Sequence, residues 1–374
     1  MPIWLTELLI WVNSRIPVFL RPSAKKIFQY LFIRVQAVAG CRRIFHGHHV
    51  EFVNSEIANL EAYEFLGPGR GEVLVESHYS LVSPGTERAV LCGLPGARRS
   101  FPYVPGYSTA GVVDKLGQGV TGLAIGDRVT GRVHHADRET IGVNRLFKIP
   151  NGVSFEDASF IELGIIVLQG IRKAGIKPGD RVVVVGQGLI GQLANRLARL
   201  LGTTSLVAVA SSRNRERSAR LPGGADDYVA VSDTPDRVHT LQADIVIEAV
   251  GTPQAVAVAM NCARDGGRVV LLGSSRGLTR DLDIWGLAQR RNLEIVGAHI
   301  SAMPDRDESP QRWTYEQEGR LFLELLDKGR LRVSDLVTWR ARPDECNAVY
   351  EVLAEGGREH VGITFNWKAE AVGA

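Results

Sequence analysis

The sequence predicts an α/β protein in which a small β-rich domain is followed by a doubly wound parallel sheet. Three observations support this fold class. The chain has 374 residues, enough for two ordinary domains, and its hydrophobic fraction of 45% can fill a sizeable core. Short strands bounded by glycine dominate residues 46 to 150, and strands alternate with helices from about Phe155 to Ala298.

The first of these regions has the pattern of a small barrel or sandwich. Val73 to His78 alternates apolar and polar residues as a half-buried strand does, and Gly111 to Asp114 and Asp127 to Thr130 are further short β segments. Many short strands separated by glycine-containing turns are typical of a closed or two-layered β domain.

The second region predicts parallel strands joined by helices. Arg181 to Val185 is an apolar strand, a helix is expected from Leu189 to Leu201, and the next strand is Ser205 to Ala210. Three more strands are expected, at 243–248, 267–272 and 293–296. This βαβ alternation is typical of a doubly wound sheet.

The remainder of the chain contains two expected helices and two expected strands. The helices are Thr314 to Lys328 and Pro343 to Ala354, and the strands are Leu336 to Trp339 and Gly362 to Phe365. We expect the last strand to return to the first domain.

Residues 1–45 form a distinct basic segment. Its only acid is Glu7, against seven Lys and Arg, and apolar residues recur at helical spacing on both sides of Pro17 and Pro22. Two amphipathic helices are therefore expected. With Trp4 and Trp11 they can lie on a membrane surface as a peripheral contact, or they can pack on the protein's own body or on a second subunit.

Composition argues against several classes of function. A formal net charge of +3 gives no reason to expect a nucleic-acid partner. The four cysteines are scattered with no CxxC pair, which argues against a disulfide scaffold and a structural zinc site. The sequence shows no signal-peptide pattern and no apolar run of about 18 residues, so a cytoplasmic location is the simplest expectation.

The strongest chemical motif is the glycine-rich turn Val185-Gly-Gln-Gly-Leu-Ile-Gly191. It follows a predicted strand and opens a predicted helix, which is the context that a dinucleotide-binding turn requires. Gly186 permits the tight turn, Gly188 lets the backbone approach the diphosphate, and Gly191 lets the helix pack on the strand. Leu189 and Ile190 belong to the same predicted site.

The end of the next strand predicts which dinucleotide is bound. An acid there would bind the ribose 2′-hydroxyl of NAD and repel the 2′-phosphate of NADP, but this chain has Ser211, Ser212, Arg213 and Arg215. Hydroxyls and guanidiniums suit a phosphate dianion, so we predict NADP(H).

From about Val50 to Asn366 the chain resembles the medium-chain dehydrogenase/reductase superfamily. The landmarks that carry the resemblance stand in the expected order: Pro84-Gly-Thr-Glu87, Val104-Pro-Gly-Tyr-Ser108, Gly111-Val-Val-Asp114, Gly126-Asp-Arg-Val129, Pro178-Gly-Asp180, the glycine-rich turn and Val250-Gly-Thr252. The resemblance implies a Rossmann domain (166–305) inserted in a GroES-like catalytic domain (46–165 and 306–374). It adds Val250, Gly251, Gly273 and Ser274 to the expected cofactor-binding residues. We also expect a homodimer that acts on a small-molecule substrate.

Departures from the superfamily concern zinc. Its zinc alcohol dehydrogenases have a Cys where this chain has Pro84, and Gly-His-Glu where it has Gly106-Tyr-Ser108. The four-cysteine loop expected after Val129 is absent, and Glu162 alone remains where some relatives keep a carboxylate ligand. One carboxylate does not hold zinc, so we predict no metal site. The motif Ser83-Pro-Gly-Thr-Glu87 resembles that of a zinc-independent branch of the superfamily. This branch includes bacteriochlorophyllide dehydrogenases and sugar- or polyol-associated members.

Without zinc, a hydrogen-bond donor must stabilise the developing alkoxide during hydride transfer. By the resemblance, Tyr107 is expected to donate a proton, Ser108 to relay it, His135 to act as a solvent-side acid or base, and Glu162 to orient a donor. Glu87 and His299 are second-line candidates. Each of these residues also has a purely structural alternative.

Three functions are compatible with these motifs. The first is zinc-independent, NADP(H)-dependent interconversion of an alcohol and a ketone. The second is reduction of an activated C=C bond by NADPH, which needs less proton machinery. The third, of another class, is a dinucleotide-binding sensor or structural protein without catalysis. If residues 1–45 meet a membrane or the mouth of the site, the substrate is expected to be large and apolar. A polyol or sugar is the opposing expectation.

Overall fold

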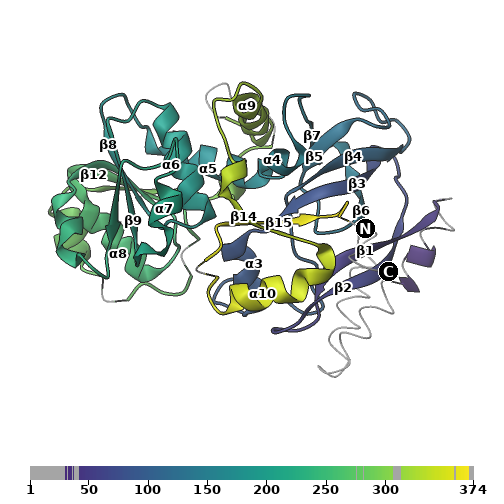
Figure 1. The fold of residues 1–374 in the computed structure, drawn as a ribbon, viewed down its shortest axis with the longest axis horizontal. Coiled ribbons are helices and arrows are strands. Elements are labelled where there is room, and N and C mark those ends of the chain that lie inside the picture. Colours follow the sequence, from purple (N-terminus) through teal and green to yellow (C-terminus); the bar gives the residue numbers. More distant parts are fainter. Residues whose placement is uncertain are drawn as a thin grey trace.

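The computed structural model describes residues 30–31, 33–35, 37, 42–274, 276–280, 282–305, 313–357 and 359–369. Two domains lie side by side: a helix-covered parallel sheet and a β-rich domain that contains both the first and the last strands (Figure 1).

The four-valine run forms the central strand of the parallel sheet. Six strands are ordered β10-β9-β8-β11-β12-β13, and every neighbouring pair is parallel. Their bounds are β8 (Arg181–Val185), β9 (Ser205–Ala210), β10 (Asp227–Ala230), β11 (Ala243–Glu248), β12 (Ala263–Leu271) and β13 (Glu294–Gly297). The strand order reverses between β8 and β11, which is where such sheets bind ligands. The predicted doubly wound sheet is thus confirmed.

Helices cover both faces of this sheet. They are α5 (Ile161–Ala174), α6 (Leu189–Leu200), α7 (Glu216–Ala219) and α8 (Pro253–Cys262), and α9 (Tyr315–Asp327) packs on α5. Most side chains of α5 are buried, because α5 packs against the sheet, α6 and α9. Helix α9 begins with a capping box, in which Thr314 accepts from the Gln317 amide and the Gln317 side chain accepts from the Thr314 amide.

The second domain is built on a mostly antiparallel sheet with the strand path β14-β15-β3-β4-β5-β7, in which β14 and β15 are parallel and β6 pairs with β3. The bounds are β3 (Glu72–Leu81), β4 (Thr109–Leu116), β5 (Arg128–Gly131), β6 (Arg138–Gly142), β7 (Leu146–Lys148), β14 (Val337–Ala341) and β15 (Gly362–Asn366). Because β15 pairs antiparallel with β3, the last strand does return to the first domain, as expected.

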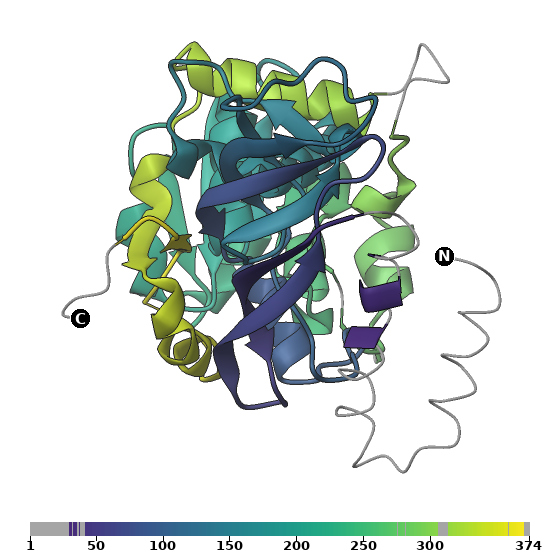
Figure 2. The ribbon, with the colours of Figure 1, turned by 90° about the vertical axis from the view of Figure 1, so that its right-hand side faces the viewer.

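Three helices and a hairpin complete this domain. The helices are α3 (Pro84–Leu91), α4 (Phe155–Ala158) and α10 (Cys346–Ala354), and the hairpin consists of β1 (Ile44–Phe52) and β2 (Ala58–Leu66). The hairpin lies at the end of the molecule remote from the parallel sheet, the end that faces the viewer in Figure 2.

Most of the expected amphipathic segment 1–45, including both tryptophans, lies outside the described residues. Within its described part, Ile33 is buried, whereas Tyr30, Leu31 and Val35 are exposed. Leu31 and Val35 are four residues apart, as on one face of a helix, and their exposure means that this face does not pack on the described body of the protein. In the part of the chain that the structure describes, no helix combines the length and apolar character needed to cross a bilayer.

Candidate active site between the two domains

A cavity of about 660 Å³ lies between the domains; we call it the interdomain cavity. Its walls are the carboxyl ends of the parallel strands, the start of α3, Tyr107 and the end of α10. This volume is in the range of small-molecule and cofactor sites. Two domains and the strand switch point therefore meet at one concave site.

The glycine-rich turn forms one wall of the interdomain cavity. Gly186 has φ +96°, and a Cβ there would lie 2.5 Å from Val250 Cγ2. A Cβ on Gly191 would lie 1.7 Å from the Gly186 carbonyl oxygen. Gly188 is the N-cap residue of α6. The first turn of a helix has backbone amides without partners inside the helix, and in α6 these amides can bind a phosphate. Gly186, Gly188, Leu189 and Ile190 line the cavity, whereas Gly191 packs behind it.

The end of β9 forms the adjoining wall. Ser211, Ser212, Asn214 and Arg215 line the cavity. The Arg215 guanidinium lies over the turn and donates to the carbonyls of Gln187, Gly357 and His360 at 3.2, 3.0 and 2.7 Å. Burial lowers its pKa. None of the described residues that line the cavity is an Asp or Glu, so the acid that binds a ribose 2′-hydroxyl is missing from this wall.

Arg213 does not line the cavity, contrary to expectation. Its side chain is 62% exposed and donates to Asp233 and Glu216 at 2.6 and 2.8 Å. Both acids lie on the solvent side of the turn and hold the guanidinium there. A direct role in binding a 2′-phosphate would require those two ion pairs to break.

The loops after β11 and β12 close the switch point. Val250, Gly273 and Ser274 line the cavity, and Gly251 lies behind them with φ +79°. A Cβ on Gly251 would lie 2.4 Å from the Ser274 carbonyl oxygen, which explains the glycine. Sequence reasoning missed Glu248, whose Oε1 accepts from the amides of Val250 and Gly251 at 2.7 and 2.8 Å. This carboxylate fixes the loop that faces the glycine-rich turn.

Tyr107 lines the interdomain cavity as part of a hydroxyl cluster with Ser83 and Thr86. Its hydroxyl donates to Ser83 Oγ at 2.7 Å, and Thr86 is also a hydrogen-bond partner. Burial raises the pKa of Tyr107 to about 12, against the opposing effect of these two hydrogen bonds. Tyr107 is therefore a neutral donor near pH 7. Sequence reasoning missed Thr86 as a candidate.

Ser108 cannot relay a proton to Tyr107 in this arrangement. It is buried, its hydroxyl donates to the Ser159 carbonyl at 2.6 Å, and its oxygen accepts from the Glu162 amide at 3.2 Å. These bonds tie β4 to the start of α5. Ser83 and Thr86, not Ser108, are the partners of Tyr107.

His135 has no access to solvent, so the expected role of a solvent-side acid or base does not fit. Its ring nitrogens contact Ser80 Oγ at 2.8 Å and Glu87 Oε2 at 3.2 Å. Glu87 also accepts from the Ser83 amide at 2.8 Å and from the Tyr350 hydroxyl at 2.5 Å. This buried network joins the barrel, α3 and α10, and supports Ser83 from behind.

Glu162 is likewise fully buried and does not line the cavity. It pairs with Arg132 at 2.8 Å and accepts a hydrogen bond from the Tyr315 hydroxyl. Burial raises its pKa, and Arg132 counteracts the rise. It does not hydrogen-bond to Tyr107, so any influence on that residue acts through space. Glu87 and His299 were the second-line candidates. The His299 side chain accepts a hydrogen bond from the Ser301 amide and caps a short helix.

The residues at the place of the superfamily's catalytic zinc do not fit a zinc ion. Pro84 has no donor atom, Tyr107 is protonated and hydrogen-bonded, and Glu162 is committed to Arg132 and Tyr315. Zinc sites in proteins use thiolate, imidazole and carboxylate ligands. Among the described residues, no three His, Cys, Asp or Glu side chains are grouped so that they could hold a metal.

Two family models match the chain. The model described as "Alcohol dehydrogenase GroES-like domain" matches residues 69–153, and the model described as "Zinc-binding dehydrogenase" matches residues 190–314. The two matches fall on the β-rich domain and on the parallel-sheet domain, in that order.

Curated relatives are dehydrogenases. D-guloside 3-dehydrogenase from Escherichia coli (strain K12) is 28% identical over 62% of this chain and 68% of the relative. L-idonate 5-dehydrogenase from Vitis vinifera is 26% identical over 71% of this chain and 79% of the relative. These relatives indicate an NAD(P)-dependent oxidoreductase of the alcohol or polyol dehydrogenase type.

Solved structures share the fold. A protein from Sinorhizobium meliloti 1021, provisionally described as a zinc-binding dehydrogenase and bound to NADP, superposes with a TM-score of 0.73 at 22% identity. The match covers 86% of this chain and 99% of that one. With both domains matched in order and in architecture, this chain belongs to the medium-chain dehydrogenase/reductase superfamily.

Proposed function

We propose that this chain is a zinc-independent, NADP(H)-dependent oxidoreductase that moves hydride between the nicotinamide and an alcohol or ketone. The observation that carries the proposal is the lining of the interdomain cavity. Three features line this cavity: the glycine-rich turn, the end of β9 with its hydroxyls and no acid, and the Tyr107 hydroxyl cluster. The same cavity thus offers a seat for the cofactor and a donor for the substrate.

The cofactor preference rests on the end of β9. The turn and the N-terminus of α6 would hold the diphosphate, and Ser211, Ser212 and Asn214 would meet the 2′-phosphate. The described part of the lining contains no carboxylate that would repel that dianion. Arg215, between the turn and the end of α10, adds positive charge to the same wall.

Protein hydroxyls take the place of the metal in this proposal. When bound, the nicotinamide supplies or accepts the hydride. Tyr107 and Thr86 stabilise the negative charge that develops on the substrate oxygen, and a proton passes to that oxygen through the cluster. The proposal places the chain in the zinc-independent branch that its Ser83-to-Glu87 motif resembles.

The lining favours a polar substrate over a large apolar one. Arg88 and Arg276 line the cavity beside the hydroxyl cluster. Guanidinium groups donate hydrogen bonds and have no acceptor, so they suit a substrate with oxygen acceptors. The activities printed for the guloside and idonate dehydrogenases involve polyhydroxylated substrates, which agrees with this preference.

The test is a substrate panel with both cofactors. NADPH and NADH oxidation would be measured with keto sugars and keto acids, apolar ketones and enones. We expect turnover with NADPH and a polar ketone. Turnover with enones alone would replace the proposal by C=C reduction. Tight NADPH binding without turnover of any of them would replace it by a sensor function.

We also propose a homodimer formed along the edge strand β13. Ile295 on β13 is exposed, and so are Leu278, Ile284 and Trp285 in the chain segment that leads from β12 to β13. An unpaired strand edge flanked by exposed apolar side chains is typical of a protein interface. Light scattering should give twice the chain mass, and Trp285→Ser should weaken the dimer. A monomeric wild type would contradict the proposal.

Peripheral membrane contact through residues 1–45 remains a separate proposal. It is supported by the exposed Tyr30, Leu31 and Val35 in the described part of this segment. Vesicle co-sedimentation of the full chain and of a chain truncated before Arg43 tests it. Equal partition of the two proteins would contradict it.

A further inference from the structure

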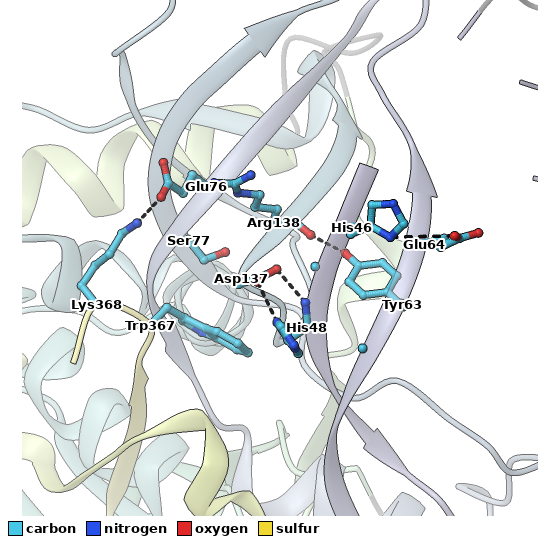
Figure 3. Close-up of a pocket in the computed structure, with 12 residues that line it drawn as sticks. His46, His48, Tyr63, Glu64, Glu76, Ser77, Asp137, Arg138, Trp367 and Lys368 are labelled. Carbon is cyan, nitrogen blue, oxygen red and sulfur yellow. Dashed lines mark hydrogen bonds and ion pairs between the residues drawn. The ribbon is translucent and has the colours of Figure 1, made fainter. Parts of the chain in front are cut away.

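A second cavity, of about 510 Å³, lies on the outer side of the β-rich domain; we call it the hairpin cavity. It is bounded by the β1–β2 hairpin, β3, residues 137–138 before and at the start of β6, and the turn after β15 (Figure 3). Among the residues that the structure describes, none lines both this cavity and the interdomain cavity. Nothing in the proposed hydride transfer uses it.

A buried hydroxyl without a hydrogen-bond partner among the described residues lies at the base of the hairpin cavity. Ser77 lies on β3, is 1% exposed and lines the cavity, and its Oγ atom has no hydrogen-bond partner. Folded proteins leave very few buried hydroxyls in this state, and the exceptions commonly bind water or a ligand. The Ser77 hydroxyl can both donate and accept, so it suits another hydroxyl.

An aromatic ring forms a second wall. Trp367 follows β15 and lies across the cavity below Ser77 in Figure 3. Its indole N–H is already used, because it donates to Ser80 Oγ at 2.9 Å. What Trp367 presents to a ligand is therefore its ring, an apolar surface suited to C–H groups.

Two acidic side chains of the lining have basic partners in the same lining. Asp137 accepts from the His48 amide at 2.9 Å and contacts His48 Nδ1 at 3.4 Å, and Lys368 forms an ion pair with Glu76. Glu64, Glu76 and Asp137 line the cavity together with Arg138 and Lys368, so both signs of charge are present there. A phosphate would meet the carboxylates, whereas a neutral ligand with several hydroxyls could donate to them and accept from the cations.

We infer that the hairpin cavity is a binding site for a neutral polyhydroxylated ligand of monosaccharide to disaccharide size. The volume of the cavity suits a ligand of this size, and the Trp367 ring suits its C–H groups. The polar side chains of the lining and the Ser77 hydroxyl suit its hydroxyl groups. The site is separate from the interdomain cavity, so it can be filled while hydride transfer proceeds.

Saturation-transfer NMR on the full chain, saturated with NADPH, tests this inference. The probes are glucose, galactose, mannose, maltose and inorganic phosphate. We expect at least one sugar to bind, and Ser77→Ala to weaken it at least about tenfold without lowering the melting temperature, since the lost hydroxyl has no partner in the fold. Ser55→Ala, an exposed serine in the hairpin turn, should bind like the wild type.

A second pair of variants separates the two cavities. Asp137→Asn should weaken sugar binding, and Tyr107→Phe, in the interdomain cavity, should leave it unchanged. The inference is overturned if no sugar binds, if binding is unaffected by Ser77→Ala and Asp137→Asn, or if only phosphate binds. Sugar binding that is lost only in Tyr107→Phe would assign the sugar to the interdomain cavity and also overturn it. None of these results depends on turnover.

Discussion

The glycine-rich turn and the Tyr107 hydroxyl cluster line the same cavity but are built in different ways. The turn consists of backbone, and two of its glycines leave no room for a Cβ against neighbouring main chain or Val250. The cluster consists of side chains from α3 and the loop before β4, held by a buried network behind Ser83. Changes at the turn should therefore act on folding and cofactor binding, and changes at the cluster on turnover.

The largest effect is expected at Gly191. In Gly191→Ala the Cβ would lie 1.7 Å from the Gly186 carbonyl oxygen, so strand and helix must separate. We expect a loss of stability of about 2 kcal/mol or more and no measurable NADPH binding. Thermal unfolding and cofactor fluorescence measure these. Tight binding by Gly191→Ala would contradict the account of the turn.

At the hydroxyl cluster, Tyr107→Phe should lower kcat by about 100-fold and change NADPH affinity less than about twofold. The reason is that in the proposal the hydroxyl stabilises the charge on the substrate oxygen and takes no part in holding the cofactor. Tyr79→Phe removes a hydroxyl on β3 outside the cavity and should behave as the wild type. An unchanged kcat in Tyr107→Phe would show that another group, with Thr86 the first to examine, is the donor.

A smaller effect is expected from a new carboxylate at the end of β9. Ser211→Asp should weaken NADPH binding by about 10-fold or more and spare NADH, because the acid repels a 2′-phosphate. Thr204→Asp adds the same charge at the opposite end of the strand and serves as the control. Arg213→Ala should have less effect than Ser211→Asp, since Arg213 is committed to Asp233 and Glu216. The reverse order would restore Arg213 as the phosphate ligand.

The smallest effect concerns pH. Burial raises the pKa of Tyr107 to about 12, so its hydroxyl keeps its proton, and its capacity to donate, throughout about pH 6 to about pH 9. At saturating NADPH, kcat for reduction should show no loss from Tyr107 ionisation in that interval. A fall of activity near pH 8 that disappears in Tyr107→Phe would place the pKa far below this value.

The difference between the two regions also explains what the sequence could predict. The parallel sheet, the turn and the returning strand β15 follow from local patterns, namely valine runs, glycine spacing and helix caps. The short strand β10, with only four residues, was missed, and so was the β1–β2 hairpin with its polar histidines. The domain boundaries at residues 45, 165 and 305 stay predictions.

The candidate site was only partly predictable. Tyr107 lines the cavity, as predicted. Ser108, His135 and Glu162 are instead buried and hydrogen-bonded to residues distant in the chain. These partners are Ser159 for Ser108, Glu87 for His135, and Arg132 and Tyr315 for Glu162. Such partners are brought together by tertiary packing, so no local pattern marks them. The same holds for Arg213, whose partner Asp233 comes from beyond the next strand.

The most direct test of the central claim is turnover of metal-stripped protein. NADPH oxidation with the best ketone of the panel would be measured before and after chelation, with the zinc content determined on the same sample. We predict equal rates at less than about 0.1 zinc per chain, far below the one ion that a catalytic zinc site holds. Activity that is lost on chelation and restored by one equivalent of zinc would contradict hydride transfer supported by Tyr107 and its neighbouring hydroxyls.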